Sequence, residues 1–451
     1  MKISLPENCN RIIDIINRHN FEAYIVGGCV RDFLCHLLPN DWDITTNASP
    51  EDIREIFGSE EDFSVIPTGE KYGTMTVFHR KTKESYEVTT YRFDGNYSDG
   101  RRPDNVQFSN ELKDDLGRRD FTINAMAYCP EKGIVDFFEG QLHIQEKIIC
   151  FVGDPTERIR EDGLRIMRAI RFSYKLQFAI EKNSFDAIDK AIDGGFLDHI
   201  SKERIRDELL VILQYFDFKS KTYPLFEKML FRIIPELKSM VGVEQYNRHH
   251  VFDLWEHSLI AMINTPNDAI LRMTLLLHDI GKLSTFTLDD SGEGHFYGHP
   301  KVSCDISREI LNRLKFDNKT KETILLLIEN HDAPFMCTKR MVKRMLGKIG
   351  KENFEILLNI RFADAAAHNP RYIYDKCIKI QTERDLYEQI IKNDECFSLK
   401  KLAINGNDLM LLGIKGREIG KCLNSCLESV IDGSLENGKD TLVKFILSKI
   451  N

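Results

Sequence analysis

The sequence predicts an α+β fold, with a small α/β head built on a mixed sheet and helices through the rest of the chain. Short apolar strands alternate with helices over the head, and from about Asp154 onward apolar residues recur at helical spacing almost to the end. The 451 residues suffice for two to four domains. We expect a head (1–140), a neck and body (141–240), an all-α domain (241–370) and a helical tail (371–451).

The composition is that of an ordinary soluble globular protein, with 42% hydrophobic and 29% charged residues. The net charge of −8 excludes a protein that is basic overall, so local basic patches would have to meet a nucleic-acid partner. Eleven cysteines without a C-x-x-C pair predict reduced thiols rather than disulfides or a zinc ribbon. No signal-peptide core and no run of membrane-spanning length occur, so we expect a cytoplasmic protein without a membrane partner.

Two adjacent glycines near the N-terminus organise the head. A short strand (24–26) ends at Gly27 and Gly28, and a helix-like run carrying Arg31 follows. Because glycine lacks a side chain, backbone N–H groups here can approach a phosphate closely, with Arg31 one helical turn away. The pattern predicts a turn that binds phosphate.

A pair of carboxylates follows. After a turn at 39–40, a second strand carries Asp41 and Asp43, which point to one face because side chains alternate along a strand. Paired carboxylates are what a two-metal phosphoryl-transfer site needs to hold Mg²⁺ against a triphosphate. A later strand (86–91) places Glu87 as a third carboxylate, although an exposed edge position would also explain that residue.

The other head elements follow from their own patterns. Isoleucines on one face predict a first helix over 7–20. Ser49 and Pro50 have the positions of an N-cap and a first helical residue. Strand patterns cover 63–66 and 74–79.

An arginine-rich segment comes next. A charged, turn-rich loop (92–104) precedes R-R-D-F, in which Arg119 and Asp120 open an apolar segment as a polar helix start facing the site would. Arginine clamps phosphate or ribose oxygens bidentately. Composition alone favours the alternative, a solvated helix start.

A long helical segment then carries Asp162 and Arg165, with Arg168 and Arg171 continuing the same three-residue row. Cytosine and adenine each pair an amino donor with an adjacent ring-nitrogen acceptor. Asp162 would accept from the amino group and Arg165 would donate to the ring nitrogen, so the row would admit only C and A and leave two arginines for phosphates. A salt-bridged solvent face is the alternative. The helix that begins at Ser201 is placed to pack its carboxylates against this row.

These segments together resemble one family. The motifs G-G-C-V-R-D…D-W-D-I-T-T, R-R-D-F-T-I-N-A, E-D-G-L-R-I-M-R-A-I-R-F and E-R-I-R-D-E-L stand in the order found in class II tRNA nucleotidyltransferases, the CCA-adding enzymes, which share a head with bacterial poly(A) polymerases. The segment 402–423 is similar to their C-terminal tRNA-binding region. By motif position the resemblance implies Asp41 and Asp43 as Mg²⁺ ligands, and it implies nucleotide contacts from Gly28, Arg31, Arg119, Asp162, Arg165, Arg168 and Arg171. Gly163 departs from the family pattern, which has Pro or Ala there, and would loosen the helix start by roughly 1 kcal/mol.

A histidine-rich block occupies the middle of the chain. An adjacent His-Asp pair with a distant histidine and a distant aspartate supplies a mixed nitrogen and oxygen set, which suits a divalent transition metal such as Ni²⁺ or Mn²⁺ better than Mg²⁺. The block resembles an HD phosphohydrolase domain. That resemblance places His257, His278, Asp279 and Asp364 in the ligand positions, and it places His299 and His331 where some HD proteins add ligands.

Three functions remain in view. The resemblance implies addition of C, C and A to a tRNA 3′ end from CTP and ATP, with tRNA gripped partly by basic patches such as 339–344 and no obligate protein partner. The HD resemblance implies phosphatase or 2′,3′-cyclic phosphodiesterase activity that would repair damaged tRNA ends. The alternatives are a poly(A) polymerase, an enzyme adding only CC or only A, and an HD phosphohydrolase with an RNA-binding head. The sequence leaves oligomeric state open.

Overall fold

The computed structural model describes residues 3–39, 41–95 and 105–450, and the chain divides into two compact units, Met1–Ile233 and Ile234–Asn451. Residues 96–104 of the expected charged loop and Asn40 of the expected turn lie outside the described residues. All eleven cysteines are free thiols. Over the described ranges, no helix has the length and apolar character needed to cross a membrane.

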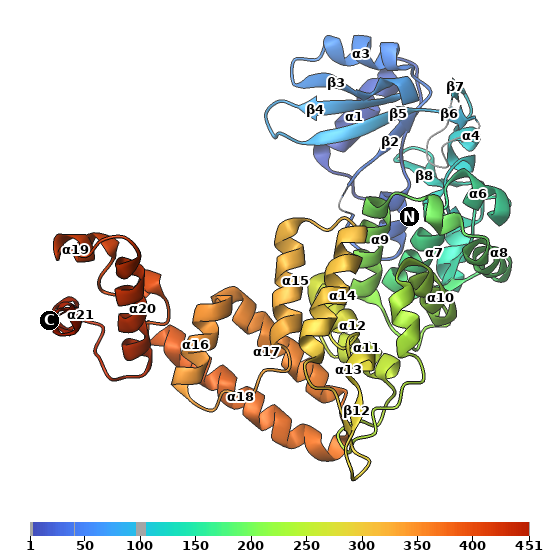
Figure 1. Ribbon diagram of the computed structural model, residues 1–451. Helices are drawn as coiled ribbons and strands as arrows, with labels where there is room; N and C mark the ends of the chain where they lie inside the picture. Colours follow the sequence, from blue (N-terminus) through green and yellow to red (C-terminus); the bar gives the residue numbers. More distant parts are fainter. Residues whose placement is uncertain (1–2, 40, 96–104, 451) are drawn as a thin grey trace. The chain divides into compact units, whose positions relative to one another are not determined.

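The first unit is built on a seven-stranded mixed sheet (Figure 1). Its strand order is β3-β4-β5-β2-β1-β8-β9. The pair β2–β5 is parallel and the other neighbouring pairs are antiparallel, as a mixed sheet requires. In chain order the strands are β1 (Ala23–Val26), β2 (Ile44–Thr46), β3 (Phe63–Gly69), β4 (Thr74–His79), β5 (Ser85–Thr90), β8 (Met126–Cys129) and β9 (Gly133–Asp136).

Helices and short pairs complete this unit. The helices are α1 (Glu7–Arg18), α2 (Gly28–Leu34), α3 (Pro50–Gly58), α4 (Leu112–Gly117), α5 (Gly140–Glu146), α6 (Pro155–Glu161), α7 (Leu164–Leu176), α8 (Lys182–Asp193), α9 (Lys202–Tyr215) and α10 (Tyr223–Ile233). Two-stranded pairs join β6 (Arg92–Asp94) to β7 (Val106–Phe108) and β10 (Ile148–Ile149) to β11 (Ala179–Ile180). The 3₁₀ turns are η1 (Glu70–Tyr72), η2 (Thr122–Asn124) and η3 (Phe196–His199).

Alternation along β1 explains how the sheet is buried on both faces. Ala23 and Ile25 belong to a core that includes the isoleucines of α1, whereas Tyr24 and Val26 belong to a second core with Leu112 of α4. The strand is therefore fully buried, and its end, where the two glycines follow, is fixed from both sides.

Most of the predicted head elements are confirmed, with small shifts in their bounds. Helix α1, strand β4 and the capping of α3 by Ser49 agree with the sequence patterns. The prediction that Asp41 and Asp43 lie on the second strand is wrong, since β2 begins at Ile44, one residue after Asp43 and three after Asp41. The ladder still reaches Asp43, because its carbonyl accepts a hydrogen bond of 3.0 Å from the N–H of Val26.

The segment R-R-D-F is not a helix start. Helix α4 ends at Gly117, Arg118 caps its C-terminus, and the chain passes through Asp120 into η2. The two arginines are therefore held by Asp115 one turn earlier, at three- and four-residue spacing.

The second unit is helical. Its main helices are α11 (Leu254–Ile263), α12 (Ala269–Leu277), α13 (Lys282–Thr285), α14 (His299–Arg313), α15 (Asn318–Asn330), α16 (Lys339–Ile349), α17 (Lys351–Ala366), α18 (Pro370–Lys392), α19 (Gly406–Leu411), α20 (Arg417–Ile431) and α21 (Lys439–Ile450). Short elements are η4 (Pro235–Met240), η5 (Leu399–Lys401) and the hairpin of β12 (Thr287–Leu288) and β13 (Gly294–His295). A separate small core joins α19, α20 and α21.

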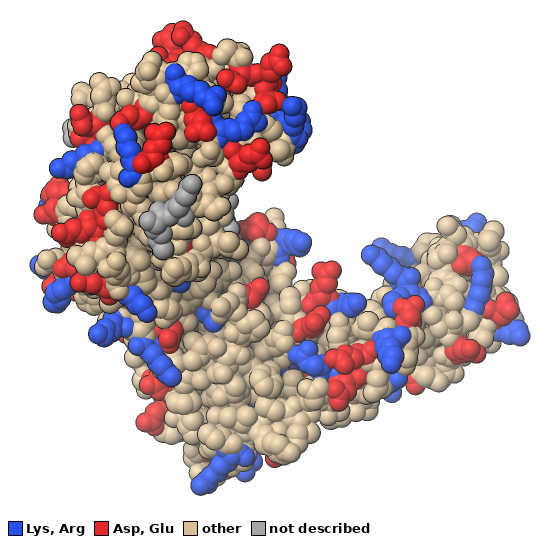
Figure 2. All heavy atoms as spheres, turned by 180° about the vertical axis from the view of Figure 1, so that it is seen from behind, with Lys and Arg blue, Asp and Glu red and all other residues tan. Residues whose placement is uncertain are grey.

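Basic and acidic side chains are interspersed over the face drawn in Figure 2. The basic side chains at the start of α16 are likewise paired with acidic side chains. Lys339 and Lys343 both pair with Glu395, at 2.6 and 2.8 Å, while Arg340 and Arg344 pair with acids of α20 and its C-cap. This segment is therefore not the free basic patch that the sequence suggested.

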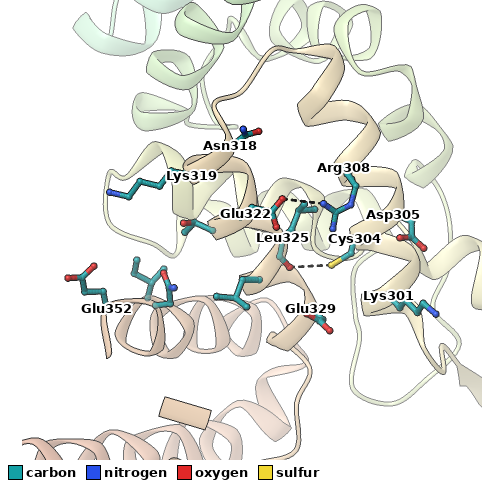
Figure 3. A pocket seen from close by; sticks show the side chains of 14 residues that line it. Lys301, Cys304, Asp305, Arg308, Asn318, Lys319, Glu322, Leu325, Glu329 and Glu352 are labelled. Carbon is teal, nitrogen blue, oxygen red and sulfur yellow. Dashed lines mark hydrogen bonds and ion pairs between the residues drawn. The ribbon is translucent and has the colours of Figure 1, made fainter. Parts of the chain in front are cut away.

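A polar groove of about 950 Å³ lies between α14, α15 and α17 (Figure 3). Arg308 donates to Glu322 at 3.3 Å across it, and the Cys304 thiol donates to the Leu325 carbonyl at 3.2 Å. The described residues that line it carry charges of both signs and include none of the predicted site residues.

Candidate functional site

The three head carboxylates line one cavity of about 770 Å³. Asp41 and Asp43 precede β2, and Glu87 lies on β5, whose parallel register pairs Val88 with Ile44. The buried residues of β5 alternate with Glu87, which leaves this carboxylate exposed to the cavity. The sequence prediction that Glu87 would join the pair is consistent with this arrangement.

The electrostatics of the cavity centre on Asp43. Partial desolvation raises the pKa of Asp43, the charge of Arg119 opposes that rise, and Glu87 and Asp41 add to it. A set of carboxylate oxygens whose charges repel one another fits a hard divalent cation such as Mg²⁺, which would relieve the repulsion.

The glycine turn places Arg119 beside these carboxylates. Gly27 has a φ of +82°, and a Cβ there would lie 2.7 Å from Nη1 of Arg119. Gly28 begins α2, and a Cβ there would lie 3.5 Å from Nη2 of Arg31. The turn therefore needs glycine at position 27 both for its backbone conformation and for the approach of the guanidinium.

Replacing Gly27 with alanine is expected to raise the KM for nucleotides by about tenfold or more, because a left-handed backbone costs about 1–2 kcal/mol and Arg119 must move. The measurement is nucleotide-addition kinetics at saturating acceptor. Gly58→Ala is the matched control, since a Cβ there meets nothing within 4 Å. Equal KM values for the two variants would contradict the assignment.

A continuous polar network runs from this turn to the helical part of the unit. Arg31 Nη1 donates to Oδ1 of Asn124 at 2.6 Å, and Asn124 Nδ2 donates to Asp120 at 2.9 Å. Arg168 donates to the other oxygen of Asp120 at 2.8 Å through Nε. Arg171 Nε lies 3.2 Å from Glu208 of α9, which confirms that this helix packs a carboxylate against the arginine row.

The charges in this network set its pKa values. Although burial acts to raise it, the charge of Arg168 and the hydrogen bond from Asn124 hold the pKa of Asp120 well below its usual range. Burial raises the pKa of Glu208 against the charges of Arg171 and Arg168. Asp120 is therefore a fixed anion that orients Arg168.

Three guanidinium groups surround one aromatic ring. Arg31, Arg168 and Arg171 lie 4.8, 5.6 and 4.5 Å from the centroid of Phe172. Clustered cations with a shared aromatic platform fit an anionic ligand such as a triphosphate.

The expected row of Asp162 and Arg165 takes a different form. Asp162 is the C-cap of α6, where it accepts from the Leu164 N–H at 3.0 Å and from Arg204 at 2.6 Å. Arg165 is buried and donates to the Arg158 and Arg118 carbonyls at 3.0 and 3.3 Å. A helix break separates Asp162, at the end of α6, from Arg165, Arg168 and Arg171, which share α7, so the acid does not lie on one continuous helix with the arginines.

Gly163 lies in this break with an ordinary helical conformation. A Cβ there would be 3.0 Å from the Phe196 carbonyl, so the close approach of η3 favours glycine at this position.

Three further residues of the site were not predicted from the sequence: Asp115, Asn124 and Arg204. Asp115 carried a usable signal, its three- and four-residue spacing from two arginines. Asn124 and Arg204 act on partners 93 and 42 residues away, and a single sequence gives no signal for such pairs.

In the second unit the predicted metal ligands come together from five helices or their ends. His257 Nε2 lies 2.9 Å from Oδ1 of Asp364, and His278 Nε2 lies 3.1 Å from Oδ2 of Asp279. The ligand atoms of these four residues lie within 4.8 Å of one another. A second such group joins Asp279 to His299 and His331. Over the described ranges, both groups of three or more ligands that meet this spacing are in the second unit.

The backbone fixes which nitrogen of each histidine faces the centre. The Nδ1 atoms of His257, His278, His299 and His331 lie 2.6–3.3 Å from the carbonyls of Ala367, Leu275, Phe296 and Ile328, to which they donate. All four Nε2 atoms therefore keep a lone pair directed at the carboxylates, as metal-ligating histidines do.

Other atoms at this centre also fit a metal. His278 Nε2 and both oxygens of Asp279 are buried without a well-aligned hydrogen bond among the described residues. Burial opposes ionisation, yet Lys282, whose ammonium lies 2.7 Å from Oδ2, is among the groups that hold the pKa of Asp279 well below its usual range. Ionised, buried and under-bonded oxygens are what a divalent cation needs.

A buried ion pair supports Asp364 from the same helix. Arg361 lies 3.0 Å from Glu383 of α18 and donates to the Ala333 carbonyl at 2.8 Å. Arg361→Met is expected to lower the free energy of unfolding by about 3–5 kcal/mol, because Glu383 would remain buried and uncompensated. Calorimetry measures this loss, and Arg313→Met, which breaks a more exposed pair, is the control. An equal loss of unfolding free energy in Arg361→Met and Arg313→Met would contradict this prediction.

Three family models match the chain. A model of the poly(A) polymerase head domain matches residues 23–150. A model described as the probable RNA and SrmB-binding site of polymerase A matches residues 177–241. A model described as tRNA nucleotidyltransferase domain 2, putative, matches residues 301–446.

Curated relatives agree with these matches. A CCA-adding enzyme of Staphylococcus saprophyticus is 31% identical over 455 residues, covering all of both chains. One from Staphylococcus haemolyticus is 40% identical over 266 residues, which are 59% of this chain and 64% of that enzyme. The crystal structure of the Bacillus stearothermophilus CCA-adding enzyme in complex with CTP is 26% identical, covers 98% of this chain and 96% of that one, and has a TM-score of 0.66.

Proposed function

Because the chain belongs to the family of CCA-adding enzymes, we propose that it adds C, C and A to the 3′ end of tRNA from CTP and ATP without a nucleic-acid template. The observation that supports this proposal most strongly is that the same unit has three carboxylates lining one cavity and an arginine network around Phe172. The proposed substrates, tRNA and nucleoside triphosphates, support a cytoplasmic location for the protein.

The transfer is a displacement at phosphorus. The 3′-hydroxyl oxygen of tRNA forms a bond to the α-phosphorus, the bond to the bridging oxygen breaks, and pyrophosphate leaves. Mg²⁺ held by Asp41 and Asp43 would supply Lewis-acid stabilisation of the developing charge. Glu87 takes up the hydroxyl proton, and Arg31, Arg119, Arg168 and Arg171 bind the triphosphate.

Nucleotide selection rests on Asp162 and Arg165. Arg204 fixes one oxygen of Asp162, so this carboxylate is held in place to accept from the amino group of C or A. To donate to the ring nitrogen of the base, Arg165 must do one of two things. It either releases one of its carbonyl acceptors or uses an N–H that does not donate to them. Guanine and uracil present a carbonyl where Asp162 accepts, which excludes them.

Product analysis tests the proposal. The protein is given transcripts that end before, within or after CCA, with CTP and ATP singly and together, and products are resolved at single nucleotides. Addition of C, C and A followed by a stop supports it. Products that stop at CC, start only from CC or run on as poly(A) would replace it with a narrower or different specificity.

A second activity is favoured by the buried histidine centre. We propose that the second unit binds divalent transition metal ions such as Ni²⁺ or Mn²⁺ and hydrolyses phosphate esters, including 2′,3′-cyclic phosphates. The two ligand groups share Asp279, with Oδ2 facing His257 and His278 and Oδ1 facing His299 and His331. Asp279 would therefore offer one oxygen to each of the two ligand groups, and bound ions would supply Lewis-acid activation of the phosphate ester.

A further inference from the structure

The head carboxylates have different neighbours on their two sides, and the strand order fixes which neighbours lie on which side. Across this end of the sheet the order is β5, β2, β1, β8, with Asp43 in the middle. The glycine turn and Arg31 lie on the β1 side, and Glu87 and Lys83 lie on the β5 side. Arg31, one of the cations proposed to bind the triphosphate, is therefore on the β1 side of the carboxylates, and the cavity extends to the β5 side.

In-line displacement needs this separation. The attacking and leaving oxygens lie roughly in line at phosphorus, so the acceptor must approach from the side opposite the pyrophosphate. The cavity on the β5 side is the space left for it. Resting on the proposed function, we propose that this cavity receives the 3′-terminal nucleotide of the tRNA, with Trp42 stacking on its base and Lys83 pairing with its phosphate.

The lining suits a nucleotide whose base changes at every step. The terminal base is first the tRNA's own last base and then C and C, so contact must tolerate any base. Stacking on an aromatic ring does so, because every base has a π-face. Trp42 packs partly against the head core and partly lines the cavity, so its position is fixed while part of its indole remains available.

Most of the charged side chains that line the cavity are carboxylates, and the lysine among them is suited to bind a phosphate. Four carboxylates face the cavity, and among the described residues that line it Lys83 is the one cation. Glu84 is already bound by Asn8 at 2.6 Å, Thr82 at 3.0 Å and Tyr86 at 3.3 Å. Lys83 is exposed and carries no ion pair among the described residues, so its ammonium group is available for a backbone phosphate.

Steady-state kinetics separate this role from nucleotide binding. Trp42→Leu is expected to raise the KM for tRNA about tenfold with the KM for CTP unchanged, and Trp42→Phe to restore most of the loss. Lys83→Gln is expected to raise the KM for tRNA severalfold and to reduce its dependence on salt. Lys81→Gln is the matched control, because Lys81 lies two residues away and pairs with Asp62 outside the cavity.

Fluorescence gives a readout that needs no catalysis. The chain has two tryptophans, Trp42 and the buried Trp255 of the second unit. Without nucleotides, tRNA ending in C is expected to quench the emission that Trp42→Phe removes. The same tRNA with an abasic terminal nucleotide is expected to leave it unchanged. Equal quenching by both RNAs, or unchanged KM values in Trp42→Leu and Lys83→Gln, would overturn the proposal. If the wild-type protein added no nucleotide, the proposed function would fail, whereas this binding assay would still report on the cavity.

Discussion

Asp43→Ala is expected to lower the rate of nucleotide addition by about a thousandfold or more, which corresponds to about 4 kcal/mol of transition-state stabilisation. Asp43 is the carboxylate whose pKa Arg119, Glu87 and Asp41 all affect, so its charge is coupled to the other charged groups of the site. Its removal deprives the site of a metal ligand at the point where charge develops. The measurement is single-turnover addition of C to a tRNA lacking CCA.

The backbone role of this residue survives the substitution, because the Asp43 carbonyl, not its side chain, accepts from Val26. The variant should therefore fold and bind tRNA normally. Glu55→Gln, on the exposed face of α3, is the matched control and should retain full activity. Retention of more than about a tenth of the wild-type rate in Asp43→Ala would remove this carboxylate from the mechanism.

Asp279→Asn is expected to abolish metal binding at both ligand groups of the second unit and to lower phosphate-ester hydrolysis by more than about a hundredfold. The amide is nearly the same shape, so the change removes charge from the residue that both groups share. His331→Gln is expected to remove the ion of one group only. Elemental analysis of the purified proteins counts the ions, and a 2′,3′-cyclic nucleotide with Ni²⁺ or Mn²⁺ measures hydrolysis.

His295→Gln, on the partly exposed β13 hairpin, is the control and should keep both metal and activity. Addition of C and A by Asp279→Asn should equal that of the wild type, since the head residues are all in the other unit. A wild-type protein that binds no ion, or identical metal content in Asp279→Asn and His331→Gln, would refute the role of Asp279 in both ligand groups.

Local patterns predicted the head well because each depends on a few adjacent residues. Ser49-Pro50 begins a helix, alternation exposes Glu87, and two glycines end a strand, whatever the rest of the chain does. The one-residue error at Asp43 has the same origin. Where a ladder ends depends on the partner strand, and Val26 is the last residue of β1 that can pair there.

The side-chain partners of the site depend on tertiary structure and could not be read from spacing. The sequence identified the arginines of the site but not their partners. Arg165 donates to backbone carbonyls, and Arg168 donates to Asp120, which lies 48 residues earlier in the chain. Helical periodicity assumed one helix through Asp162, and a break at Gly163 moved that side chain to a cap. The histidine centre was predicted more fully, because metal chemistry restricts the residue types that can meet.

The sheet order has a consequence for how the head reaches its native state. Strand β1 has β2 and β8 as neighbours, and Ile25 pairs with Tyr128, so the glycine turn is held in place only after about a hundred intervening residues have been made and folded. Contacts of such sequence separation form slowly and late. A nascent or truncated chain that stops before β8 therefore carries Asp41 and Asp43 without the geometry that makes them reactive, and nucleotide transfer begins only when the last central strand has been added.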